Sequence, residues 1–173
     1  MNREILRTVG LIAIALLLHV GMADANEAGD SKPVSSQDGE HLDKNGDPTF
    51  NIAQDGTVDW YTYVGYLRYG GNCLQCHGPD GLGSSYAPSL VDSLKALNYA
   101  DFLSVVAGGK KDVNAAQQLV MPSFGTNPNV MCYVEPIYVY LRARSDGALG
   151  RERPEKHEPE PTAFSTAEDS CMG

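Results

Sequence analysis

The sequence has few basic residues, and they do not gather into a basic patch. Lysine and arginine number 13 against 22 aspartates and glutamates, which gives a formal net charge of −9. A surface that binds nucleic acid neutralises phosphates with lysine and arginine, so this composition excludes nucleic acid as a partner. An acidic protein of this kind is instead suited to a partner that presents a positive surface.

A long hydrophobic run is also missing. The longest run, Val9–Val20, is shorter than the about 20 apolar residues that a membrane-spanning helix requires. Arg3 and Arg7 precede this run, and a small-residue site, Ala23-Asp24-Ala25, follows it. This is the layout of a cleaved secretory signal over residues 1–25, and the alternative of an uncleaved anchor is disfavoured by the length. We therefore expect a periplasmic protein with no membrane span in its mature form.

Cysteines are few, and one pair of them is closely spaced. Cys73 and Cys76 belong to the run CLQCH, which ends in His77, whereas Cys132 and Cys171 stand apart. A zinc site requires four ligands, and no second close pair is present. A thioredoxin-like redox pair requires alternating strands and helices around the thiols, but the surroundings are helical and glycine-rich. A structural disulfide between Cys73 and Cys76 stays open but leaves His77 unexplained.

A fourth interpretation accounts for all three residues of this run. The pattern C-x-x-C-H is the attachment signature of a c-type haem, in which both thiols form thioethers to the macrocycle. The histidine that follows then binds the iron. We therefore predict one covalently attached haem c, with Cys73 and Cys76 as its attachment residues and His77 as the proximal ligand.

The second iron ligand is predicted from the methionines. Met121 lies in the glycine- and proline-containing loop VMPSFG, where a thioether ligand would raise the haem potential. Met131 begins a predicted helix and is expected to fill the core, Met172 lies near the C-terminus, and Met22 belongs to the signal. A metal-bound histidine usually donates its other N–H to a carbonyl. Pro88 is the predicted source of that carbonyl, with a simple turn proline as the alternative.

Apolar residues at three- and four-residue spacing predict three helices, over residues 57–70, 98–109 and 130–144. Asp59 is expected in the first turn of the first helix, and Gly70-Gly71 is expected to end it. Asn98 is the predicted N-cap of the second helix. The segments that follow the first two helices are predicted to be loops, over residues 78–97 and 110–129.

The parts of the chain outside residues 56–146 are predicted to be less regular. Residues 26–55 have few large apolar side chains and are expected to form an irregular N-terminal arm. Asp43, Asn45 and Asp47 resemble part of a calcium loop but lack its later glutamate, which favours a solvated turn. Residues 147–173 are charged and contain prolines, so we expect a surface extension without a core of its own.

These motifs resemble the monohaem class I cytochromes c. Gly65, Tyr69 and Cys73 reproduce that family's Gly-x-x-x-aromatic-x-x-x-Cys spacing, and Ile137 and Tyr140 occupy the positions of the last helix that cross it. A glycine at such a crossing lets two helix backbones approach closely. The resemblance implies an all-α class I cytochrome c fold, with three main helices around one covalently attached haem.

Residues 56–173 are more specifically similar to the four-cysteine, methanol-metabolism-related c-type cytochromes, relatives of cytochrome cL. The runs that match are DWYTYVGY, CHGPDGLGSSYAPSL, VMPSFGTNPNVMCY, YLRARSDGALGRERP and SCMG. This similarity implies a periplasmic electron acceptor for a methanol or alcohol dehydrogenase that depends on pyrroloquinoline quinone (PQQ). It would pass electrons to a downstream c-type cytochrome or oxidase. The alternatives are a general periplasmic electron shuttle, and a haem enzyme or gas sensor in which Met121 dissociates.

The remaining cysteines fit this interpretation. With Cys73 and Cys76 bound to haem, Cys132 and Cys171 are left in an oxidising compartment, where free thiols tend to pair. A disulfide between them would tie residues 147–173 back to the last helix.

A protein whose iron has both axial positions filled is predicted to be an electron carrier and not an enzyme. No acid–base pair or nucleophile can be placed from the sequence. Electrons would pass through an exposed haem edge in a small, short-lived contact, and association with a basic partner should weaken as salt rises. The residues predicted to flank that edge are Tyr86, Ala87, Ser123 and Phe124.

Overall fold

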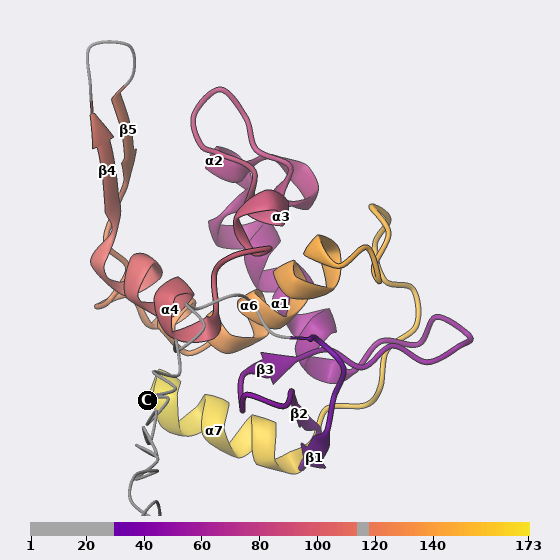
Figure 1. The fold of residues 1–173 in the computed structure, drawn as a ribbon. Coiled ribbons are helices and arrows are strands. Elements are labelled where there is room, and N and C mark those ends of the chain that lie inside the picture. Colours follow the sequence, from indigo (N-terminus) through magenta and orange to yellow (C-terminus); the bar gives the residue numbers. More distant parts are fainter. Residues whose placement is uncertain (1–29, 114–117) are drawn as a thin grey trace, which may run out of the picture.

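Three helices form the body of the structure, a computed structural model that describes residues 30–113 and 118–173. They are α1 (Trp60–Asn72), α4 (Tyr99–Gly108) and α6 (Val134–Ser145), and α6 packs against both of the others (Figure 1). The predicted N-cap of the middle helix is confirmed, because the Asn98 side chain accepts the N–H of Asp101 at 2.8 Å. The predicted signal, residues 1–25, lies outside the described residues. In the two described ranges, no helix combines the length and the hydropathy of a membrane span.

The ends of α1 differ from the sequence expectation. Asp59 is not in the first turn but is the N-cap residue, and it is fully buried. Its carboxylate accepts the N–H of Thr62 at 2.8 Å and the hydroxyl of Thr62 at 2.6 Å. The helix also continues through Gly70 and Gly71, where the sequence predicts an end. Neither glycine adopts the positive φ that commonly ends a helix, so the helical hydrogen bonds run on toward the cysteine pair.

Helices α1 and α6 cross at Gly65. A Cβ atom at Gly65 would overlap the carbonyl oxygen of Pro136 and would lie 2.9 Å from the Cβ of Tyr140. Glycine is therefore required for this approach of the two backbones. The rings of Tyr66 and Tyr69 pack on the ring of Tyr140, with centroids 5.7 and 5.4 Å away. The crossing that the sequence predicts is thus confirmed.

We expect Gly65→Ala to lower the free energy of unfolding by about 1–3 kcal/mol, because the added methyl group forces the two backbones apart. The matched variant is Gly70→Ala in the same helix, where a Cβ atom meets nothing within 4 Å. Alanine is about 1 kcal/mol more favourable than glycine inside a helix, so this control should be neutral or stabilising. Urea unfolding followed by circular dichroism measures both. Equal midpoints for the two variants would contradict the steric argument.

The last predicted helix is interrupted. A short helix, α5 (Pro128–Met131), precedes α6, and Tyr133 between them has φ −128° and ψ 12°, outside the helical region. The predicted disulfide between Cys132 and Cys171 is present and lies at this break. Cys132 thus forms its disulfide at the point where the chain changes direction between α5 and α6. Helix α6 itself is the centre of the core, since nearly all of its side chains are buried.

The N-terminal arm, residues 26–55, is predicted to be irregular, but its described part has regular structure. It contains an antiparallel sheet in the order β1 (Ser35–Gln37), β2 (Glu40–Leu42) and β3 (Pro48–Thr49). Asp38 and Gly39 have φ values of 53° and 86°, as a two-residue type I′ turn requires. The strands are too short to show an alternating pattern, so the Asp-Gly pair is the sequence signal that could have revealed them.

A buried ion pair fastens this sheet to α6. Asp43 and Arg142 meet at 2.7 Å with 0% and 2% of their side chains exposed. Arg142 also donates to the carbonyl of Pro48 at 3.0 Å, and the other carboxylate oxygen of Asp43 accepts the N–H groups of Asn45 and Asp47. Asp43 is therefore buried and not in a solvated turn. Its charge is compensated by a guanidinium far away in the sequence.

Two further elements differ from the sequence expectation, and the first of them, a hairpin, corrects the all-α fold class. A hairpin of β4 (Lys110–Val113) and β5 (Gln118–Met121) projects from the body where the sequence predicts a loop (Figure 1). Helix α7 (Thr162–Met172) ends the chain, and it buries Phe164 against the rings of Tyr61 and Trp60. The hairpin strands have only four residues each, and α7 has one large aromatic residue, so neither shows a clear apolar period. The fold is mainly helical with two small sheets.

Candidate functional site

The predicted attachment residues follow directly on α1. Cys76 and His77 belong to α2 (Leu74–His77), a single turn in which the His77 N–H donates to the carbonyl of Cys73 at 2.9 Å. Both thiols are free, with Cys73 half-buried and Cys76 exposed. Burial, with a smaller effect of the Cys76 thiol, raises the pKa of Cys73 to about 12. The disulfide between these two cysteines, which the sequence leaves open, is not formed in the structure.

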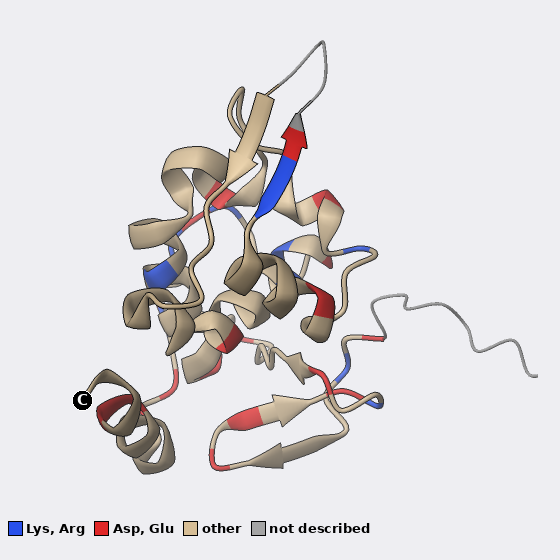
Figure 2. Cartoon of the chain, turned by 90° about the vertical axis from the view of Figure 1, so that its left-hand side faces the viewer, with Lys and Arg blue, Asp and Glu red and all other residues tan. Residues whose placement is uncertain are grey.

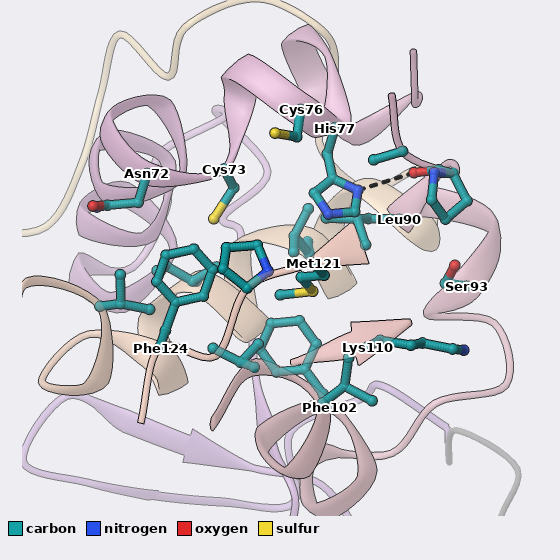
Figure 3. Close-up of a pocket in the computed structure, with 18 of the residues that line it drawn as sticks. Asn72, Cys73, Cys76, His77, Leu90, Ser93, Phe102, Lys110, Met121 and Phe124 are labelled. Carbon is teal, nitrogen blue, oxygen red and sulfur yellow. Dashed lines mark hydrogen bonds between the residues drawn. The ribbon is translucent and has the colours of Figure 1, made fainter. Parts of the chain in front are cut away.

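The imidazole of His77 is held in one orientation. It is 7% exposed, and its Nδ1 atom lies 3.0 Å from the carbonyl oxygen of Pro88 (Figure 3). The structure thus brings together the two residues that the sequence pairs. When Nδ1 donates its proton to this carbonyl, Nε2 keeps its lone pair and is available as a metal ligand.

Pro88 reaches His77 because the loop between them folds back on itself. The N–H of Gly83 donates to the carbonyl of His77 at 2.8 Å. Gly83 has a φ of +87°, and a Cβ atom there would lie 2.7 Å from the nitrogen of Ser89 and 3.0 Å from the carbonyl carbon of Pro88. A larger residue at Gly83 would therefore displace the peptide that orients His77. The predicted loop over residues 78–97 contains two short helices, η1 (Pro79–Gly81) and α3 (Leu90–Ser93).

Met121 is the last residue of β5 and is partly buried against the core. The loop that follows it is fixed to α4 by two backbone hydrogen bonds. They run from Phe124 to Val106 at 3.0 Å and from Gly125 to Ala107 at 3.1 Å. Met121 thus ends the hairpin and begins a loop that is anchored on α4.

His77, Met121 and both free cysteines line one cavity of about 220 Å³ (Figure 3). Its remaining walls are mainly apolar, and they include Leu90, Leu97, Phe102, Val106, Ile137 and Leu141. Such walls exclude water and suit an apolar group.

The rim of this cavity is partly as predicted. Among the four expected flanking residues, those that line it are Tyr86, Ala87 and Phe124. Ser123 does not line it, because its hydroxyl turns to the carbonyl of Ala107. Four residues of the hairpin also line the cavity and were not predicted from the sequence: Lys110, Asp112, Leu119 and Val120. Leu119 and Val120 adjoin Met121 in the sequence, whereas Lys110 and Asp112 reach the cavity through the strand pairing.

The donor set of the cavity fits haem c. Two free thiols are spaced for two thioether bonds, one imidazole is oriented by a carbonyl, and one thioether lies in the same cavity. Among the described residues there is no group of three or more histidine, cysteine and acidic side chains that could hold a metal ion. The zinc alternative therefore gains no support.

Met131 faces a different cavity. This second cavity, of about 370 Å³, is lined by Met131, Cys132 and Glu135 among others. Burial, assisted by the charge of Glu40, raises the pKa of Glu135 to about 7. Met131 is thus separated from His77, whereas Met121 shares a cavity with it.

The chain is similar in sequence to two known cytochromes. Over 125 residues it is 54% identical to cytochrome c-553I of Paracoccus denitrificans, which covers 72% of this chain and 55% of that protein. Over 93 residues it is 37% identical to cytochrome c-555 of Methylococcus capsulatus, which covers 53% of this chain and 69% of that protein. The chain therefore spans about half the length of the Paracoccus protein.

A solved structure is similar over most of both chains. The crystal structure of the c-type cytochrome XoxG from Methylobacterium extorquens AM1 has a TM-score of 0.76 and 51% sequence identity. The match covers 82% of this chain and 86% of that one. A comparison with protein-family profiles finds no family that matches.

Proposed function

The chain belongs to the class I c-type cytochromes, electron carriers with covalently bound haem c, and we propose that it serves alcohol oxidation in the periplasm. Its electron donor would be a PQQ-dependent methanol or alcohol dehydrogenase, and its acceptor a downstream c-type cytochrome or oxidase. The similarity of residues 56–173 to methanol-related cytochromes supports this donor. The signal-like layout of residues 1–25 supports the compartment.

One observation carries the proposal: His77, oriented by Pro88, shares a cavity with Met121 and two free thiols. In the proposed site Cys73 and Cys76 attach haem c, and His77 and Met121 bind its iron. Haem c supplies a one-electron couple, whose potential a methionine ligand raises. With His77 and Met121 as its ligands, the iron would have no position left for a substrate.

The number of electrons released by each alcohol oxidation determines how often the protein must meet its donor. An alcohol oxidation releases two electrons, and each molecule of this protein accepts one. Two successive encounters are therefore needed for each turnover, so the complex must form and separate quickly. This requirement favours a small interface at the low end of the usual range.

Stopped-flow mixing with a purified PQQ-dependent methanol dehydrogenase and methanol tests the proposal. We expect the visible bands of the haem to change from ferric to ferrous at a rate that rises with dehydrogenase concentration. Faster reduction by a purified quinol-oxidising complex would instead support a general shuttle. Binding of carbon monoxide to the reduced protein at neutral pH would support a haem enzyme or sensor. Absence of reduction by the dehydrogenase overturns the proposed donor.

Tyr86 at the rim of the cavity is expected to contribute to docking. It is 73% exposed, and aromatic side chains supply much of the binding energy of protein interfaces. We expect Tyr86→Ala to lower the second-order rate constant of reduction about fivefold, which corresponds to about 1 kcal/mol. Leu67→Ala is the control, since Leu67 is 43% exposed on α1 and does not line the cavity. Stopped-flow reduction measures both, and equal rate constants would exclude Tyr86 from the contact.

A further inference from the structure

Lys110 lies at the side of the cavity away from the two cysteines. Figure 3 shows the thiols of Cys73 and Cys76 on one side of His77, and Lys110 on the other side together with Ser93. In haem, the two carboxylate side chains project from the edge opposite the vinyl groups. A haem attached at Cys73 and Cys76 would therefore direct its carboxylates toward the side on which Lys110 lies.

Lys110 also carries the positive charge that would attract a haem carboxylate. Among the described residues that line the cavity, it is the one lysine or arginine, and Asp112 is the one aspartate or glutamate. In the described part of the chain, the Lys110 ammonium group has no hydrogen bond or ion pair. A lysine is a compact point charge on a flexible stem, so it is able to reach a carboxylate at the rim.

The neighbouring Lys111 provides an internal comparison. Successive side chains of a strand point to opposite faces, and Lys111 does not line the cavity. The hairpin register pairs Lys110 with Met121 and Lys111 with Val120. Both lysines are exposed, and they form the blue segment of β4 in Figure 2. They carry the same charge at adjacent positions, and they differ in the face they occupy.

We propose that Lys110 forms an ion pair with a haem carboxylate and thereby raises the reduction potential of the haem. The inference rests on the proposed haem attachment. Reduction adds an electron to the haem, so a cation held beside it favours the ferrous form. Lys111 on the other face stays in solvent, where salt screens its charge. Asp112, on the cavity face, acts in the opposite direction.

Midpoint potentials from mediated redox titration of the haem-loaded proteins test the effect of Lys110 on the reduction potential. Lys110→Gln is expected to shift the ferric–ferrous equilibrium about threefold toward the ferric form, about 28 mV at 59 mV per tenfold change. Lys110→Arg should retain the potential, and Lys111→Gln should leave it unchanged. An intact Met–iron charge-transfer band in each variant shows that the proposed iron ligation stands, whatever the outcome for Lys110. Loss of haem from the unmodified protein would instead defeat the proposed function.

Infrared difference spectra on reduction, with ¹³C-labelled haem carboxylates, test the contact itself. We expect a labelled carboxylate band to shift in Lys110→Gln and not in Lys111→Gln. A Lys110→Gln potential equal to that of the unmodified protein overturns the proposal. So does a lowered potential with unchanged carboxylate bands, since that result means a field effect without an ion pair.

Discussion

Met121→Ala is expected to abolish the red charge-transfer band of the ferric Met–iron bond and to lower the midpoint potential by at least about 59 mV, a tenfold shift in the redox equilibrium. The thioether ligand favours the ferrous form, so its loss destabilises the reduced protein. Alanine would also leave the iron without its second protein ligand. The reduced variant should therefore bind carbon monoxide at neutral pH, whereas the unmodified protein should not.

Met131→Ala is the matched control for this prediction. Met131 is a methionine of similar burial, packed against the core, but it lines the second cavity and not the one that contains His77. Its loss should leave the charge-transfer band, the potential and the lack of carbon monoxide binding unchanged. Survival of the band in Met121→Ala, together with its loss in Met131→Ala, would show that Met131 is the iron ligand.

The features that the sequence predicts are those with local signals. Cys73, Cys76 and His77 lie within one helical turn, so their spacing alone determines how they are presented. Asn98 caps α4 by accepting the N–H of a residue only three positions away. Gly65 lies where α1 crosses α6, and the apolar periodicity of α6 can be read from its own sequence. Met121 is the predicted iron ligand because few methionines compete with it.

The features that the sequence does not predict depend on partners far along the chain. The ion pair between Asp43 and Arg142 joins residues 99 positions apart, and neither residue has a local pattern that indicates its partner. The hairpin that carries Lys110 has strands of only four residues each, so tertiary context decides its structure. The turn at Asp38 and Gly39 is different, because its Asp-Gly pair is a local hairpin signal that the prediction of an irregular arm overlooked.

Removal of the disulfide by the double substitution Cys132→Ala and Cys171→Ala is expected to lower the free energy of unfolding by about 4 kcal/mol. The bond joins residues 39 positions apart, and closing a loop of that length restrains the unfolded chain by about this amount. The double variant is a cleaner comparison than a chemical reductant, which would also reduce the haem. Urea unfolding of the oxidised holoprotein provides the measurement, and a loss below about 1 kcal/mol would contradict the entropic account.

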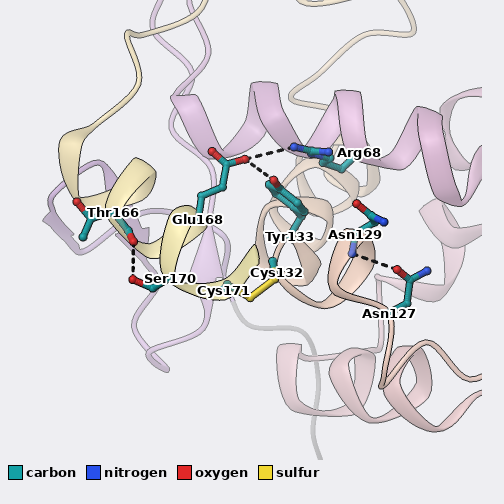
Figure 4. Close-up of a disulfide and its surroundings, with 9 residues drawn as sticks. All are labelled: Arg68, Asn127, Asn129, Cys132, Tyr133, Thr166, Glu168, Ser170 and Cys171. Carbon is teal, nitrogen blue, oxygen red and sulfur yellow. Dashed lines mark hydrogen bonds and ion pairs between the residues drawn. A yellow bond between two sulfur atoms is a disulfide. The ribbon is translucent and has the colours of Figure 1, made fainter. Parts of the chain in front are cut away.

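Helix α7 has contacts of its own that should survive loss of the bond. Glu168 pairs with Arg68 at 3.3 Å and accepts the hydroxyl of Tyr133, and the Arg68 guanidinium lies 3.6 Å from the centre of the Tyr133 ring (Figure 4). Burial and the hydrogen bond to Glu168 raise the pKa of Tyr133. These contacts act in the folded state, whereas the disulfide acts mainly on the unfolded one.

Phe164→Ala in both backgrounds distinguishes these two effects. Phe164 is 6% exposed, and its ring centroid lies 5.1 Å from that of Tyr61 and 6.1 Å from that of Trp60. Its truncation should cost about 3–5 kcal/mol with the disulfide present. If α7 stays docked without the bond, the cost in the double-alanine background should agree within about 0.5 kcal/mol. A cost near zero there would mean that α7 detaches, and that the disulfide holds the helix in place as well as restraining the unfolded chain.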